Sequence, residues 1–261
     1  MPHPRTLPVA SDVWLVRSPL DGPGLPLNTL VVAGEDPVLV DTGPAPDRAL
    51  WWAQVEALVD VADVRWLVLG HDDPAHCGGL ADVLDRCPGA TVVASWAMEE
   101  RLAQRLPGLD PGRLRWVADG DVLRAGGRDL CVLRPPAYDS PATVGLYDAA
   151  SGLYWASVCF GTPLPHDVDE VSVLDRDVWE DGFSTYHRRL APWIADVDPA
   201  RWRAAVGRVA VQGPRTIASA RGPLIRRGDV GRALDLLTDL AGLPEPAPRR
   251  SVPPTPGTSV A

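Results

Sequence analysis

The segment of residues 64–79, VRWLVLGHDDPAHCGG, limits the possible folds more than any other part of the chain. Its first half is an apolar run typical of a buried strand, and its second half is a loop that ends in two glycines before a helix predicted from Leu80. His71 and Asp73 lie two positions apart on an extended loop, so both side chains can point the same way, and His76 follows in the next turn. Such a cluster at the carboxyl end of a strand suits a metal site or general acid–base chemistry.

Strands and helices are predicted to alternate along the first half of the chain. Helices are expected at residues 48–59, 80–86 and 98–106, between strands at residues 12–17, 29–33, 37–40, 65–69 and 91–94. In the second half of the chain, strands are predicted at residues 113–117, 122–123, 129–133 and 216–220, and a hairpin is predicted between residues 144–147 and 153–157. Helices are predicted there at residues 168–190, 199–209 and 230–240. The alternation favours a layered α/β fold.

The composition limits the classes of partner. The chain has 261 residues and a net charge of −9, so nucleic acid is not an expected partner, because neutralising phosphates takes clustered basic residues. No apolar run is long enough to cross a membrane and no signal-peptide pattern opens the chain, so we expect a cytoplasmic protein. We expect one domain over residues 1–243 and a disordered, Pro-rich tail over residues 244–261. The four cysteines have no CxxC spacing and are expected to be reduced.

The loop motif resembles that of the metallo-β-lactamase superfamily, His-x-His-x-Asp-His-x-Gly-Gly. It is most similar to the branch of flavodiiron and oxygen-binding di-iron proteins, in which a carboxylate replaces the second histidine; here that carboxylate is Asp73. Ala75 stands at the position of the motif's aspartate. The resemblance covers most of residues 12–241 and implies the αββα sandwich of the metallo-β-lactamase type.

Four further positions carry the resemblance. Asp41 ends an early strand in Asp-Thr-Gly, where the superfamily has an aspartate that supports the metal loop; a turn-capping role is the alternative. Asp139 stands two residues before a proline, where di-iron relatives have a histidine ligand. Val158 replaces the aspartate that bridges two metals, and Arg221 replaces a final histidine before Gly-Pro. Neither valine nor arginine can coordinate a metal.

The residues at the family's ligand positions are sufficient to bind one metal ion, not two. The first metal position would draw on His71, Asp73 and Asp139, whereas the second would keep His76 alone. We therefore expect either no metal or one divalent ion of iron, manganese or zinc. Arg221 adds a positive charge that can pair with Asp73 or Asp139 and hold that carboxylate ionised without a metal.

Other side chains are expected to support the site or to line a pocket for a small organic ligand: Asp41, Tyr138, Trp155 and Cys159. Tyr138 and Trp155 in particular are expected to form an aromatic wall. His166 is expected in solvent on a loop, and His187 on the surface of a helix, because arginines follow it in the sequence.

Three functions remain open at this stage. The first is an enzyme that acts on a small-molecule substrate by hydrolytic or redox chemistry with at most one metal ion. The second is a metal-free enzyme of specialised biosynthesis, in which Asp73, His76 and Asp139 act as acid and base and Arg221 stabilises an anion. The third is an inactive relative that binds a ligand or a protein partner. Flavodiiron proteins carry an additional flavodoxin domain, and the length of this chain leads us to expect no flavin. We also expect a homodimer, because many proteins that the chain resembles are dimers.

Overall fold

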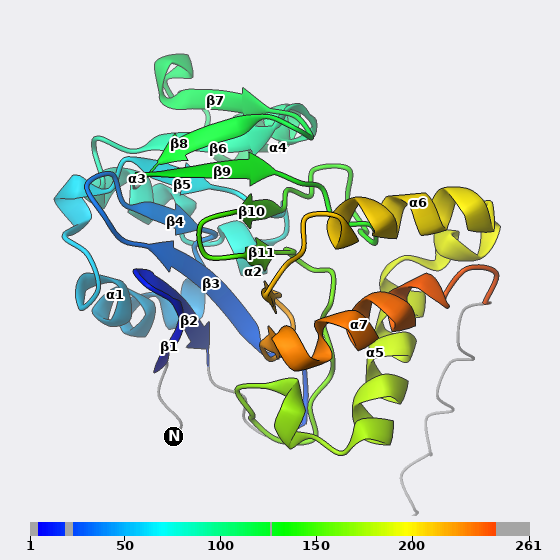
Figure 1. Cartoon of the computed structure of the whole chain (residues 1–261). Helices are drawn as coiled ribbons and strands as arrows, with labels where there is room; N and C mark the ends of the chain where they lie inside the picture. The colour runs from blue at the N-terminus through cyan, green and yellow to red at the C-terminus, as the bar shows by residue number, and fades with distance from the viewer. Residues whose placement is uncertain (1–4, 19–22, 126, 244–261) are drawn as a thin grey trace, which may run out of the picture.

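Two β-sheets lie face to face in the computed structural model, which describes residues 5–18, 23–125 and 127–243 (Figure 1). The first sheet has the strand order β1-β2-β3-β4-β5-β6-β7. Its strands are β1 (Arg5–Ala10), β2 (Val13–Ser18), β3 (Leu27–Val32), β4 (Val38–Val40), β5 (Trp66–Val68), β6 (Thr91–Ser95) and β7 (Leu114–Val117). The second sheet has the order β13-β12-β11-β10-β9-β8. Its strands are β8 (Val122–Ala125), β9 (Arg128–Val132), β10 (Leu146–Asp148), β11 (Leu153–Trp155), β12 (Thr216–Ala218) and β13 (Ile225–Arg226).

Helices cover the outer face of each sheet. The first sheet is covered by α1 (Arg48–Glu56), α3 (Leu80–Arg86) and α4 (Glu99–Arg105), and the second by α5 (Arg176–Leu190), α6 (Pro199–Ala210) and α7 (Arg227–Thr238) (Figure 1). Strands β4 to β7 pair in parallel, as expected where helices connect them. The predicted αββα sandwich is confirmed.

Three apolar layers hold the sandwich together. The middle layer joins the inner faces of the two sheets, with Val13 and Val40 from the first and Leu130 and Trp155 from the second. One outer layer packs the first sheet against α1, α3 and α4, and the other packs the second sheet against α5, α6 and α7. Burial of this apolar area is the main stabilising term of such a fold.

Several sequence expectations are confirmed, and others need adjustment. The predicted hairpin forms between β10 and β11, with Leu146 opposite Trp155. The helix expected at residues 168–190 begins only at Arg176, because the Asp175 carboxylate accepts the N–H groups of the first turn and caps it. Strand β1 was not expected. The tail predicted to be disordered, residues 244–261, lies outside the described residues, and within the described ones no helix has the length and apolar character needed to span a membrane.

Candidate metal and acid–base site

The loop after β5 contains a short helix, α2 (Pro74–Cys77), that the sequence analysis treated as loop. Asp73 caps this helix: its Oδ1 accepts the N–H of Ala75 at 2.9 Å and of His76 at 3.1 Å. Proline at the first helical position after an aspartate is the sequence signal that predicts such a helix. The cap fixes the direction of the Asp73 side chain and leaves Oδ2 facing the rest of the site.

Asp41 holds the loop after β5 in place through two hydrogen bonds. It is fully buried, its backbone has φ +64°, and its Oδ1 accepts the N–H of Gly70 at 2.6 Å. Its Oδ2 lies 2.7 Å from Nδ1 of His76, which is also fully buried. Because a carboxylate accepts hydrogen bonds, this contact assigns the imidazole proton to Nδ1 and leaves the Nε2 lone pair free. Within the described part of the chain, Nε2 of His76 has no hydrogen-bond partner.

His71 connects the loop to Asp139. Its Nδ1 accepts the backbone N–H of Asp73 at 3.1 Å, and its Nε2 lies 2.8 Å from Oδ1 of Asp139. Burial alone would lower the pKa of His71, but the hydrogen bond and charge of Asp139 outweigh it, and the pKa is raised. Burial likewise would raise the pKa of Asp139, but the hydrogen bond with His71 outweighs it, and that pKa is lowered.

Arg221 pairs with Asp73 across the site. Its Nη2 donates to Asp73 Oδ2 at 3.1 Å, through one nitrogen rather than through both arms of the guanidinium. Burial would raise the pKa of Asp73, but its electrostatic interactions with His76 and Arg221 outweigh burial and lower that pKa. A guanidinium therefore lies where the resemblance implies a metal-ligating histidine.

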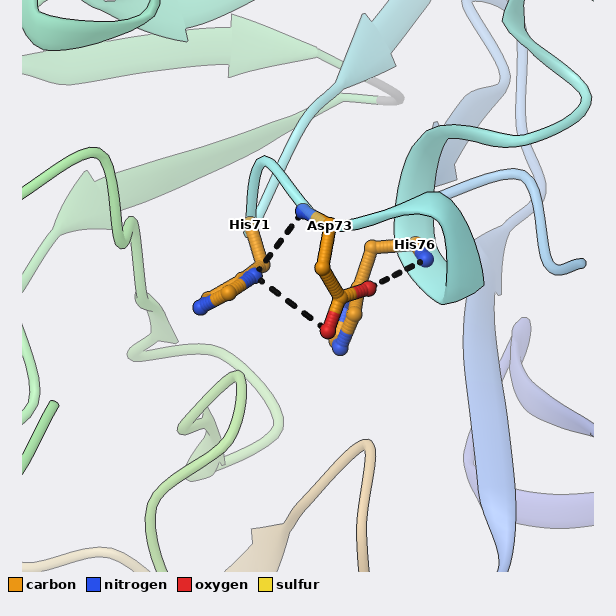
Figure 2. A group of neighbouring side chains, drawn as sticks. All are labelled: His71, Asp73 and His76. Carbon is orange, nitrogen blue, oxygen red and sulfur yellow. Dashed lines mark hydrogen bonds and ion pairs between the residues drawn. The ribbon is translucent and has the colours of Figure 1, made fainter. Parts of the chain in front are cut away.

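The structure gathers three potential ligands, His71, Asp73 and His76, whose ligand atoms all lie within 4.8 Å of one another (Figure 2). All three belong to the predicted ligands, which were His71, Asp73 and Asp139 with His76 as a further ligand. Asp139 instead engages the far nitrogen of His71 and has 43% of its side chain exposed. The sequence could not distinguish these arrangements, because the direction of each side chain depends on the cap and on the packing of the loop.

Two positions at which the resemblance implies an aspartate ligand, 75 and 158, carry apolar residues. Val158 is 2% exposed, and Ala75 lies on α2. Tyr186, from α5, donates its hydroxyl to the carbonyl of Val158 at 2.8 Å, and burial raises the pKa of the phenol. Tyr186 was not predicted to lie near the site, because it is on a helix more than twenty residues beyond Val158 and gives no local signal in the sequence.

The expected aromatic wall is not formed. Trp155 is fully buried between the sheets, so it cannot line an open pocket. The Tyr138 ring turns to Trp193, with ring centroids 5.1 Å apart. Cys159 is also fully buried, and burial raises the pKa of its thiol to about 12, so it is an unreactive core residue rather than a pocket residue.

The expectation for His187 is wrong, whereas His166 is exposed as expected. His187 is fully buried: its Nε2 accepts the N–H of Phe160 at 2.8 Å, and its Nδ1 donates to the carbonyl of Phe183 at 2.8 Å. Burial lowers the pKa of His187 to about 4, so the ring is neutral. It fixes the turn at Phe160, a residue with φ +60°.

Comparison with known families identifies the fold group. Residues 27–206 match the protein family described as ODP family beta lactamase. The chain belongs to this family. The resemblance to the metallo-β-lactamase superfamily, near its flavodiiron branch, is thereby confirmed.

Individual relatives of this ODP domain are flavoproteins and flavodiiron proteins. The chain is 31% identical to a putative diflavin flavoprotein A 2 of Nostoc sp., over 53% of this chain and 24% of that protein. Its fold is similar to the flavodiiron protein of Giardia intestinalis (TM-score 0.78, 18% identity, 92% of this chain and 60% of that one). It is also similar to rubredoxin oxygen:oxidoreductase of Desulfovibrio gigas (TM-score 0.77, 16% identity, 90% and 61%). The chain thus spans about a quarter of that curated relative.

These relatives correct the expected cofactors. Their names include flavin and a di-iron centre, so the expectation of no flavin is wrong. The expected set of no metal or one divalent ion likewise finds no support in these relatives, one of which is named as a flavodiiron protein.

Proposed function

We propose that this chain is an oxidoreductase domain of the flavodiiron kind that acts on a small molecule and holds at most one metal ion. The family match and the names of its relatives support the reaction class. The observation that carries the metal count is the ion pair between Arg221 and Asp73, because it places a positive charge where a second ion would need a ligand.

The remaining donor set fits a single ion. Nε2 of His76 is buried and has no hydrogen-bond partner in the described structure. Asp41 holds the imidazole in the tautomer that leaves the lone pair of Nε2 free to bind an ion. Asp73 and His71 complete a group of two nitrogens and a carboxylate, which suits iron, manganese or zinc. A bound iron would supply electron exchange with the small molecule.

The protein's own residues set the charge of this site. Arg221 keeps Asp73 ionised, and His71, whose Nδ1 accepts the N–H of Asp73, carries its proton on Nε2 beside Asp139. The pair His71–Asp139 can therefore hold a proton at Nε2 of the imidazole, at a half-exposed edge of the site. We propose that this pair delivers protons to a small molecule bound beside the cluster. We also propose that the chain forms a homodimer.

The metal-free enzyme is a second candidate, favoured by the same ion pair. Arg221 satisfies Asp73 Oδ2 without any ion. In this alternative the guanidinium of Arg221 stabilises an anionic substrate, and Asp73, His76 and Asp139 act as acid and base.

Zinc titration followed by calorimetry separates the two candidates, because zinc probes the ligands without redox chemistry. We expect no more than one zinc per wild-type chain, with affinity reduced at least tenfold in His76→Gln and unchanged in the control His166→Gln, an exposed histidine. Circular dichroism verifies that both variants fold. Unaltered binding in His76→Gln would refute the assigned ligand set, and no zinc binding by the wild type would favour the metal-free enzyme.

A further inference from the structure

A small pocket of about 260 Å³ lies beside the site, on the outer side of the loop that carries Asp139. Its walls come from Arg134 and Tyr138 on that loop, from Trp193, and from Arg201 on α6. No residue of the cluster His71, Asp73 and His76 lines it. It is therefore a separate cavity, and it was not expected from the sequence.

One wall of this pocket is aromatic. The rings of Tyr138 and Trp193 lie with centroids 5.1 Å apart at 49°. Trp193 Nε1 donates to the carbonyl of Tyr138 at 2.9 Å, so the indole is fixed against the loop and its polar atom is already satisfied. A fixed ring pair of this kind offers π surface to a flat ligand at little cost in side-chain entropy.

The charged residues of the lining are positive on balance. It contains three arginines and one aspartate, a net formal charge of +2. Arg208 pairs with Asp119. Among the described residues, the guanidinium groups of Arg134 and Arg201 form no salt bridge; the aspartates near them, Asp119 and Asp198, accept their backbone N–H groups. The Arg134 guanidinium lies 5.8 Å from the centroid of the Tyr138 ring, and Arg201 is exposed at the rim.

We propose that this pocket binds a planar aromatic carboxylate of a single ring. Its volume is just below the range of about 300–1,000 Å³ for drug-sized ligands, which limits the occupant to a small molecule. The ring packs against the wall that Tyr138 and Trp193 form, and the carboxylate takes charge-assisted hydrogen bonds from Arg134 or Arg201.

The location of the pocket gives such a ligand a route to the site. Tyr138 immediately precedes Asp139, and Asp139 Oδ1 lies 2.8 Å from His71 Nε2. A ligand stacked on Tyr138 therefore contacts the peptide segment that positions Asp139. The inference goes beyond the proposed redox function and does not require it, because binding is measured directly.

Calorimetric titration of the full chain with benzoate tests the proposal. We expect one benzoate per chain in the millimolar to micromolar range, with affinity about three- to tenfold lower in Arg201→Gln and in Arg134→Gln. The control Arg203→Gln removes an exposed arginine of α6 that does not line the pocket, and binding should be unchanged. Because Arg201 is exposed, its variant keeps the test valid even where Arg134→Gln fails to fold.

Two analogues test the two halves of the recognition. Benzamide lacks the charge and should bind at least tenfold more weakly than benzoate. Cyclohexanecarboxylate lacks the π face and should also bind more weakly. The proposal is overturned if benzoate does not bind, if Arg203→Gln weakens binding as much as Arg201→Gln, or if either analogue binds as tightly as benzoate.

Discussion

The buried neutral His187 makes the stability of this protein depend on pH in a defined direction. Its pKa is lowered from 6.5 to about 4 in the folded state. The unfolded chain therefore binds the proton more readily, and the stabilisation is complete above about pH 6.5 and is lost as the pH falls towards 4. One pKa unit corresponds to about 1.4 kcal/mol, so the full effect is about 3 kcal/mol, of which about 2 kcal/mol is lost between about pH 8 and about pH 5.

A histidine variant isolates this contribution from the other titrating groups. In His187→Gln the amide oxygen can still accept the N–H of Phe160, but no proton binds. Urea unfolding at about pH 8 and about pH 5 should show that the wild type loses about 2 kcal/mol more than the variant between the two conditions. The matched control His166→Gln removes an exposed histidine and should follow the wild type. Equal losses in the wild type and in His187→Gln would refute the reasoning.

Two further predictions concern buried groups and close contacts. Asp41→Asn should lower the free energy of unfolding by about 1–3 kcal/mol, because the buried carboxylate accepts two hydrogen bonds, whereas the exposed Asp36→Asn should change it by less than about 0.5 kcal/mol. Gly207→Ala, in the interior of α6 where an added Cβ meets nothing within 4 Å, should stabilise by up to about 1 kcal/mol. Gly145→Ala should destabilise by about 1–3 kcal/mol, because the Cβ would collide with the carbonyl oxygen of Leu133. Urea unfolding measures all four, and an Asp36→Asn loss equal to that of Asp41→Asn, or equal effects of the two glycine variants, would contradict these assignments.

The fold was predictable because its local signals agree with its global arrangement. Apolar strands alternate with amphipathic helices, and the turn before Leu153 fixes the hairpin of β10 and β11. The start of α5 was placed too early, because the capping by Asp175 competes with a helical pattern that begins further upstream.

The sequence predicted which residues lie near the site, but it did not predict which of their side chains contact one another. The sequence placed His71, Asp73 and His76 on one loop, but nothing in it shows that Asp139 contacts the outer nitrogen of His71, because that choice depends on side-chain direction. His187 illustrates a signal that was present and was overlooked. Trp179, Phe183 and His187 recur every four residues on the buried face of α5, and this spacing predicts burial better than the arginines that follow.

The iron content of the full-length protein, purified without a metal-affinity step and measured by elemental mass spectrometry, tests the central claim most directly. The wild type should contain no more than one iron per chain, because Arg221 and Val158 occupy ligand positions of a second ion. The double variant Val158→Asp, Arg221→His restores a carboxylate and an imidazole and should bind more iron than the wild type. Two irons per wild-type chain would contradict the proposed site.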